Sequence, residues 1–240
     1  MGDALPRLCD IYDKIRRKEE TLEPLIISLS GEPKSGKTHF ALTAPEPIEV
    51  FDFDGGVLTL LDKFAGKDVR LYQYIMDVWG KEKVSPMWDG FLGSYKKALA
   101  GDAQTIVLDT ATQTWEILRL AYFEKESPGD KHFAFEYGKP NSLMRSIISA
   151  PRVHGKNLIL THYIREVWNA EGKKTGEIVS DGFKHTEGLA NLVLGFEAKA
   201  RKPTGEDTLV TILRSREARE LVGETLVNPD WDTLVALLEV

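Results

Sequence analysis

The sequence contains little cysteine and no long apolar run. Its 240 residues include a single cysteine, Cys9, which excludes an internal disulfide and agrees with a reducing compartment. No stretch of about eighteen apolar residues occurs, and no charged-then-apolar N-terminus ends in small residues, which argues against membrane insertion and export. We therefore expect a cytoplasmic protein without a membrane partner.

Internal repeats, low-complexity tracts and linker-like segments are also missing. Their absence sets aside collagen, coiled-coil and solenoid classes. It predicts one domain over residues 1–240, with 1–24 as a helical extension and 25–240 as the core. Residues 8–18 have helical apolar spacing and a basic cluster, which either contacts nucleic acid or a neighbouring subunit or is a solvated helix face. The formal net charge of −6 means that any nucleic-acid contact must come from a local patch.

Short apolar runs alternate with helical stretches along most of the chain. This alternation predicts an α/β fold, with a mostly parallel central sheet and helices on both faces. Near the C-terminus the period changes to that of two strands joined by a Pro-Thr-Gly turn, which predicts an antiparallel hairpin. A last helix over 228–240 would be capped by Asn228 or Asp230. The expected strands are residues 25–29, 47–56, 68–74, 105–108 and 156–164, and the hairpin covers 189–218.

A glycine-rich turn separates the first strand from the first core helix. Gly31, four variable residues and then Gly36, Lys37 and Thr38 match G-x-x-x-x-G-K-[ST], whose backbone N–H groups cradle phosphate oxygens. We expect Lys37 to reach the β- and γ-phosphates and Thr38 to bind Mg²⁺. The alternative is a glycine-rich turn with a surface lysine. ATP and Mg²⁺ are the expected cofactors, and no guanine-reading Asn-Lys-x-Asp pattern occurs. The predicted nucleotide-binding residues are Gly31, Glu32, Pro33, Lys34, Ser35, Gly36, Lys37, Thr38 and His39.

Two strands end in carboxylates. Asp109 follows the apolar run "TIVL" at the edge where open α/β sheets bind ligands, so it is predicted to hold Mg²⁺ beside Thr38, or else to cap the next helix. Asp52 and Asp54 alternate with phenylalanines, which predicts both carboxylates on one face of their strand. We choose Asp54 as the general base because it lies closer to the catalytic edge. The alternative is a turn aspartate.

A third strand ends in a histidine. His162, in "ILTHYIRE", is expected to sense the γ-phosphate and to relay its loss to a loop that begins at Arg165. A lone histidine in this place can equally be a satisfied structural residue.

Together these stretches resemble the RecA-like ATPase core. "GEPKSGKT" resembles its phosphate loop, "VFDFDGG" its strand with the catalytic acid, "TIVLDTATQTWE" its magnesium-binding strand, and "NLILTHYIRE" the strand before its second DNA-binding loop. The similarity covers residues 25–216 and is greatest to compact phage ATPases of single-strand annealing and recombination. RecA has a glutamate where Asp54 stands.

The resemblance implies an assembly. Its members use one ATP site per subunit, associate side by side with ATP at the subunit interfaces, and carry single-stranded DNA on loops. We accordingly expect a homo-oligomeric ring or short filament. By the same resemblance, Arg214 and Arg216 are predicted to reach a neighbour's γ-phosphate.

Two segments, residues 124–140 and 165–185, combine cations with aromatic rings, a composition on which unpaired bases stack. We expect the second to be a flexible, glycine-containing stretch. Phe133 and Tyr137 are at helical spacing and could instead be core residues, and the lysines could be merely solvated. The predicted DNA contacts are Lys131, Phe133, Phe135, Tyr137, Arg165, Trp168, Lys173, Lys174 and Lys184.

The sequence thus predicts a DNA-stimulated ATPase that binds single-stranded DNA and promotes annealing or strand exchange. A single-strand DNA-binding protein is a further candidate partner. One alternative is an ATP-driven switch or loader that acts on a partner protein and has little DNA affinity. Another is a small-molecule kinase, although no arginine-rich lid motif is found.

Overall fold

The computed structural model describes residues 23–76, 84–126, 133–200 and 205–238. The predicted helix at 8–18 and the predicted DNA contact Lys131 lie outside these ranges. Within them, eight strands form one sheet in the order β10-β9-β8-β1-β5-β4-β2-β3. The strands are β1 (Ile26–Gly31), β2 (Ile48–Asp52), β3 (Val69–Gln73), β4 (Thr105–Asp109), β5 (Asn157–His162), β8 (Leu192–Ala200), β9 (Glu206–Ser215) and β10 (Thr225–Val227).

Most of this sheet is parallel. Strand β1 pairs in parallel with β5 and β8, β4 with β5 and β2, and β2 with β3. Strand β9 runs antiparallel to β8 and β10, so the predicted parallel sheet and C-terminal hairpin are both confirmed. Strand β5 lies between β1 and β4, so the end of β5 lies between the ends of the strands that carry the phosphate loop and Asp109.

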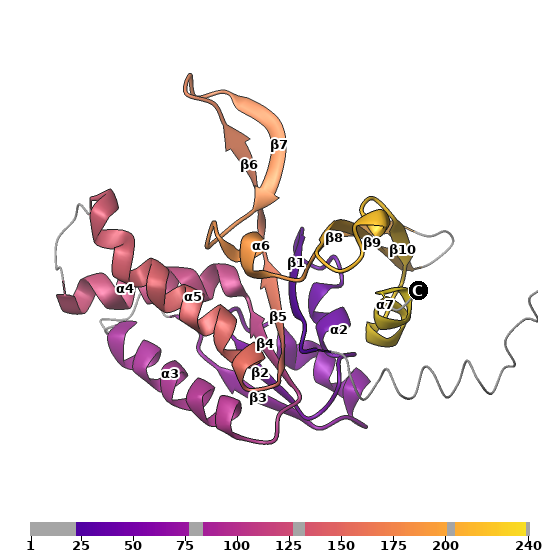
Figure 1. The fold of residues 1–240 in the computed structure, drawn as a ribbon, viewed down its shortest axis with the longest axis horizontal. Coiled ribbons are helices and arrows are strands. Elements are labelled where there is room, and N and C mark those ends of the chain that lie inside the picture. The colour runs from indigo at the N-terminus through magenta and orange to yellow at the C-terminus, as the bar shows by residue number, and fades with distance from the viewer. Residues whose placement is uncertain (1–22, 77–83, 127–132, 201–204, 239–240) are drawn as a thin grey trace, which may run out of the picture.

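Helices cover both faces of the sheet, as predicted (Figure 1). Helices α3, α4 and α5 pack on one face, and α2, η1 and α7 on the other. The helices are α2 (Lys37–Ala41), α3 (Val84–Ala100), α4 (Ala111–Glu126), α5 (Gly138–Val153), α6 (Thr186–Leu189) and α7 (Trp231–Leu238), with short 3₁₀ turns η1 (Val57–Phe64), η2 (Ala134–Tyr137) and η3 (Arg219–Leu221). None of the helices in the described ranges has the length and apolar character needed to cross a membrane.

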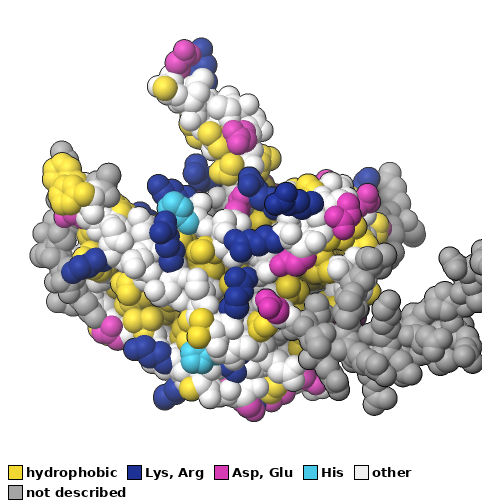
Figure 2. All heavy atoms as spheres, viewed as in Figure 1, with side chains coloured by type: hydrophobic (Ala, Val, Ile, Leu, Met, Phe, Trp, Pro, Cys, Tyr) yellow, Lys and Arg dark blue, Asp and Glu magenta, His cyan; other side chains and the backbone are white. Residues whose placement is uncertain are grey.

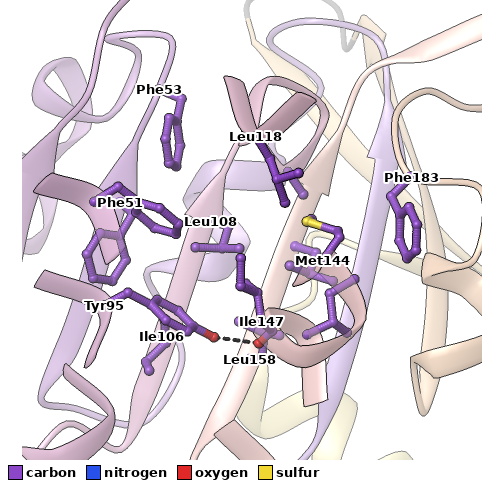
Figure 3. Packing of buried hydrophobic residues seen from close by; sticks show 14 of the residues in the cluster. Phe51, Phe53, Tyr95, Ile106, Leu108, Leu118, Met144, Ile147, Leu158 and Phe183 are labelled. Atoms are coloured by element: carbon purple, nitrogen blue, oxygen red, sulfur yellow. Dashed lines mark hydrogen bonds between the residues drawn. The ribbon is translucent and has the colours of Figure 1, made fainter. Parts of the chain in front are cut away.

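The strand alternation divides the core into two layers. Ile106 and Leu108 of β4 pack under α3, α4 and α5, whereas Val107 packs on the α2 side. Figure 3 shows the first layer, in which the Tyr95 hydroxyl donates a 2.7 Å hydrogen bond to the Ile147 carbonyl. Burying each such apolar side chain stabilises the fold by about 1.5–3 kcal/mol. The two layers hold the carboxyl ends of β1, β2, β4 and β5 at one edge.

The stretch after Arg165 differs from the expectation of a flexible loop. Strands β6 (Ile164–Trp168) and β7 (Lys174–Ser180) form an antiparallel hairpin, which projects from the body as an arm (Figure 1). Its turn is held by Asn169, whose Oδ1 accepts bonds from the N–H groups of Glu171 and Lys173 at 3.0 and 2.9 Å. We call this hairpin, residues 164–180, the arm.

Of the two proposed caps of the last helix, the structure selects Asp230. Its Oδ1 accepts a 2.9 Å bond from the Thr233 N–H. The Asn228 side chain instead accepts a 2.7 Å bond from the Thr208 N–H, near the start of β9.

Candidate active site

The phosphate loop runs from the end of β1 to the start of α2 and requires both of its glycines. A Cβ on Gly31 would lie 2.4 Å from the Phe196 carbonyl oxygen, and one on Gly36 would lie 2.7 Å from Thr208 Oγ1. Gly36 also has a φ of 98°, a conformation that side chains with a Cβ disfavour. The loop is therefore packed closely against β8 and β9.

The Lys37 ammonium lies inside this loop. Its Nζ donates bonds of 2.8 and 2.7 Å to the carbonyl oxygens of Gly31 and Glu32, and the side chain is buried. Burial lowers the pKa of Lys37, and the nearby carboxylates of Asp109 and Asp54 partly oppose that shift. A cation held by neutral carbonyl groups in a glycine-rich concavity fits a polyphosphate guest, because phosphate oxygens would supply the missing counter-charge.

Asp109 meets two hydroxyl groups from different segments. Thr38 Oγ1 donates to Asp109 Oδ2 at 2.8 Å, and Thr161 Oγ1 donates to Oδ1. The structure thus brings Thr38 and Asp109 together, as predicted for a magnesium site. The alternative cap role falls to Thr110, whose Oγ1 accepts the 3.2 Å bond from the Gln113 N–H at the start of α4.

The electrostatics of Asp109 fit a metal ion. Burial raises the pKa of this carboxyl to about 6, and Asp54 and Asp52 add to the rise. In the described residues no three His, Cys, Asp or Glu side chains are grouped to hold a metal by themselves. A Mg²⁺ ion at Thr38 and Asp109 would therefore complete its oxygen shell with phosphate oxygens and water, as is usual for this ion.

Asp109→Asn should stabilise the nucleotide-free protein at neutral pH. A carboxyl whose folded pKa is raised supports the fold while protonated and loses that support as the pH rises through about 6. At about 1.4 kcal/mol per pKa unit, the gain at pH 7 is on the order of 2–3 kcal/mol. The unfolding temperature measured from pH 4 to 7 should show a gain that grows with pH, while the extra stabilisation by Mg-ATP disappears.

Asp102→Asn is the matched control for that experiment. Asp102 is exposed, and its bond with Arg70 lowers its pKa to about 2, so its loss should bring no stability gain. If the unfolding temperatures of the native protein and of Asp109→Asn changed with pH in the same way, the raised pKa of Asp109 would be contradicted.

Asp52 and Asp54 have different surroundings. The strand ends at Asp52, which is buried, and its Oδ1 accepts a 2.8 Å bond from the Gly55 N–H while its Oδ2 accepts a 3.2 Å bond from Gln73 Nε2. Burial raises the pKa of Asp52. Asp54 is exposed and lies beyond the end of β2, so the prediction that the two carboxylates lie on one face of a shared strand is wrong. Asp52 and Asp54 each accept a backbone N–H of the following turn, from Gly55 and Gly56. The turn role considered for Asp54 is therefore present, and its exposure also leaves it available to a water molecule.

His162 is buried at the end of β5, opposite Ser30 in the register with β1. Burial lowers its pKa to about 4, so the ring is neutral at pH 7. Its Nδ1 lies 3.1 Å from the Asp181 carbonyl oxygen, and because a carbonyl only accepts, Nδ1 carries the proton. Among the described residues its buried Nε2 has no hydrogen-bond partner, which leaves an acceptor free beside the phosphate loop. The sensor role stays a prediction.

The predicted DNA contacts fall in separate places. Phe133 and Phe135 are 67% and 80% exposed, and their rings stack 5.8 Å apart. Tyr137 is half-buried, and its ring lies edge-on to that of Phe123, with 5.1 Å between the ring centroids. On the arm, Trp168 is 59% exposed and Lys174 Nζ lies 5.8 Å from its ring. The other predicted cations of this group are Arg165 and Lys173 on the arm and Lys184 just before α6.

The two predicted trans-acting arginines rest against α6. Arg214 Nε lies 3.1 Å from Glu187 Oε2, and Arg216 donates to the Gly188 carbonyl. Figure 2 shows Lys and Arg side chains gathered around α6 at the base of the arm. The structure therefore does not bring these arginines to the phosphate loop of their own chain, and their role toward a neighbour stays a prediction.

Sequence reasoning missed the partner of Asp54. The Tyr163 hydroxyl donates a 2.9 Å bond to Asp54 Oδ2. The two residues are 109 positions apart, and a tyrosine after a strand carries no pattern that announces such a contact.

A family model described as "AAA domain" matches residues 23–212. The matched range contains the phosphate loop, Asp54, Asp109, His162 and the arm, whereas Arg214 and Arg216 lie beyond it. No curated protein matches the chain.

Proposed function

Because the chain belongs to the AAA domain family of P-loop ATPases, we propose that it hydrolyses Mg-ATP while bound to single-stranded DNA and promotes strand annealing or exchange. The observation that carries the nucleotide part is the phosphate loop with the 2.8 Å bond between Thr38 and Asp109. A hydroxyl near the start of α2 and a carboxylate at the end of β4, beside the buried Lys37, suit a nucleoside triphosphate and its metal.

In the proposed hydrolysis each residue has a separate task. Lys37 stabilises the negative charge on the β- and γ-phosphates, and Asp54 accepts a proton from the attacking water. Mg²⁺, when bound, would neutralise charge on the phosphate oxygens. The free Nε2 of His162 would accept a hydrogen bond from a water or protonated group near the γ-phosphate, and its Nδ1 would pass any shift to Asp181 at the end of the arm.

The DNA part of the proposal is supported by exposed aromatic rings and by the arm. Phe133 and Phe135 offer ring faces to solvent, and Trp168 with Lys174 combines a ring with a cation. Exposed rings of this kind stack on unpaired bases irrespective of sequence. The resemblance to RecA-like ATPases inferred from the sequence adds the expectation of a ring or short filament with ATP at the subunit interfaces, to which Arg214 and Arg216 would contribute.

The test is DNA binding by the double variant Phe133→Ala, Phe135→Ala. Each stacked base is worth about 1–3 kcal/mol, so the affinity for single-stranded DNA should fall by roughly tenfold or more. Binding should be measured by fluorescence anisotropy over a salt series, because phosphate contacts also make it salt-dependent. Val153→Ala, which removes an exposed apolar side chain at the end of α5, is the matched control and should bind as the native protein does.

A switch that acts on a protein partner is the second candidate function. The net charge of −6 does not favour DNA, and the arm carries two exposed apolar residues, Trp168 and Ile178 at 59% and 63%, which would suit a protein surface. A rate of ATP hydrolysis that is the same with and without single-stranded DNA would favour this candidate over the first, provided that DNA binding is also undetectable or insensitive to salt.

A further inference from the structure

The bond between Tyr163 and Asp54 joins the candidate base to the root of the arm, by which we mean residues 163 and 181 that flank it. Tyr163 stands between the last residue of β5 and the first residue of β6. Its hydroxyl donates to Asp54 Oδ2 at 2.9 Å, and the other oxygen, Oδ1, accepts a 3.0 Å bond from the Gly56 N–H. Each carboxylate oxygen thus has one donor that restricts its rotation, and each keeps accepting capacity for a water.

The backbone of Tyr163 is held on both sides. Its N–H donates to Thr112 Oγ1 at 3.1 Å, and its carbonyl accepts a 2.8 Å bond from the Asp181 N–H. The Thr112 hydroxyl donates in turn to the Asp181 carbonyl at 2.8 Å, the same oxygen that His162 Nδ1 approaches. Residues 163 and 181, which flank the arm, are therefore bonded to each other and to the start of α4. A movement of this root would therefore move the Tyr163 backbone and with it the position from which the hydroxyl reaches Asp54.

The chemistry of the pair gives the bond one direction. Burial, reinforced by the neighbouring Asp54 carboxylate, raises the pKa of Tyr163, so the phenol keeps its proton at neutral pH and donates. The other charged groups that face Asp54 are Lys37 of the phosphate loop, Asp52 of β2 and Asp109 of β4. The Lys37 ammonium bonds to carbonyl groups of its own loop. Among the described side chains it is the Tyr163 phenol, which is also hydrogen-bonded to the Gln113 side chain, that donates to Asp54.

We propose that Tyr163 is a positioning residue for Asp54 and that it ties the orientation of this carboxylate to the root of the arm. The inference rests on the proposed role of Asp54 as general base. A ligand that binds the arm would act on the segment that carries Tyr163. Through the bond to Asp54, such binding would therefore change the rate of ATP hydrolysis. Tyr163 itself touches neither the phosphate loop nor the attacking water in this scheme.

Tyr163→Phe tests the proposal with the full chain, Mg-ATP and a single-stranded oligonucleotide. A misoriented base slows the chemical step, so kcat should fall by about tenfold or more while KM for ATP stays unchanged. The stimulation of kcat by the oligonucleotide should shrink in the same variant. A native kcat would overturn the positioning role, and a lowered kcat with undiminished DNA stimulation would overturn the link to the arm.

The double variant Tyr163→Phe, Asp54→Asn separates this inference from the proposed base. If Tyr163 acts through Asp54, removing its hydroxyl should cost nothing further once Asp54 is asparagine. A kcat in the double variant that is lowered by the product of the two single-variant factors would overturn the proposal. A native kcat in the single variant Asp54→Asn would instead reject the role of Asp54 as general base. A strongly lowered kcat in Asp54→Asn, together with a native kcat in Tyr163→Phe, would reject only the positioning role of Tyr163.

Tyr95→Phe is the matched hydroxyl deletion. Its phenol bonds to the Ile147 carbonyl inside the core, between α3 and α5 (Figure 3). This variant should lower the unfolding temperature and leave kcat unchanged. Tyr163→Phe should show the reverse pattern, a lowered kcat with an unfolding temperature close to that of the native protein. A large loss of stability in Tyr163→Phe, together with a normal kcat per folded molecule, would overturn the proposal.

Discussion

Lys37→Ala is expected to lower the rate of ATP hydrolysis by about a hundredfold to a thousandfold, the usual cost of removing one preorganised donor from the charge that develops in the transition state. The Lys37 ammonium lies in the concavity of the phosphate loop and is satisfied there by the carbonyl groups of Gly31 and Glu32. Bound phosphates would take those bonds, so ATP affinity should weaken as well. Phosphate release in steady state and equilibrium titration with ATP measure the two losses separately.

Lys96→Gln is the control for this result. Lys96 is an exposed residue of α3, so its loss changes the net charge by the same amount away from the phosphate loop. Activity near the native value is expected for Lys96→Gln. Substantial hydrolysis by Lys37→Ala would show that the loop is not the site of the reaction.

Asp54→Asn is expected to lower kcat by about a hundredfold to ten-thousandfold, the range assigned to a positioned proton acceptor. Asparagine keeps the size of the side chain but has a single oxygen, so it can accept only one of the bonds that Tyr163 and Gly56 donate to Oδ2 and Oδ1. It also cannot take the proton of the attacking water. ATP affinity should stay close to native, because the hydrogen bonds that the described structure gives the Asp54 carboxylate come from Tyr163 and Gly56 and not from the phosphate loop. Single-turnover hydrolysis and ATP titration together distinguish lost chemistry from lost binding.

Asp52→Asn is the informative comparison, since Asp52 ends β2 and Asp54 follows two residues later. The two oxygens of the buried Asp52 accept bonds from Gly55 and Gln73. An asparagine there would turn its NH₂ group toward one of these two N–H donors, so it should chiefly lower the unfolding temperature. If Asp52→Asn abolished hydrolysis and Asp54→Asn did not, the two roles would have to be exchanged.

Local patterns determined much of the fold and the nucleotide site in advance. The phosphate loop is one contiguous stretch in which glycine spacing, lysine and threonine are all visible in the sequence, and the family match over 23–212 agrees with it. The parallel sheet followed from apolar strands that alternate with helices, because strands buried on both faces must be apolar throughout. Asp109 was found for a related reason: the carboxyl ends of parallel strands meet at one edge.

Other features depended on neighbours that the sequence does not announce. The stretch after Arg165 looked like a flexible loop, yet cross-strand pairing over 164–180 makes it a projecting arm. Tyr137 and Phe135 look alike in sequence, but one packs on Phe123 and the other is 80% exposed.

By itself, the sequence determined the class of fold, the phosphate loop and the edge of the sheet at which chemistry is expected, because these follow from local spacing and from which residues must be buried. Only the tertiary structure decided that Asp52 holds a turn while Asp54 faces solvent, and that Tyr163 reaches Asp54. The physical reason is that a hydrogen bond needs two groups within about 3 Å. Periodicity specifies which face of an element is buried, whereas such distances between remote segments arise only when the strands pack.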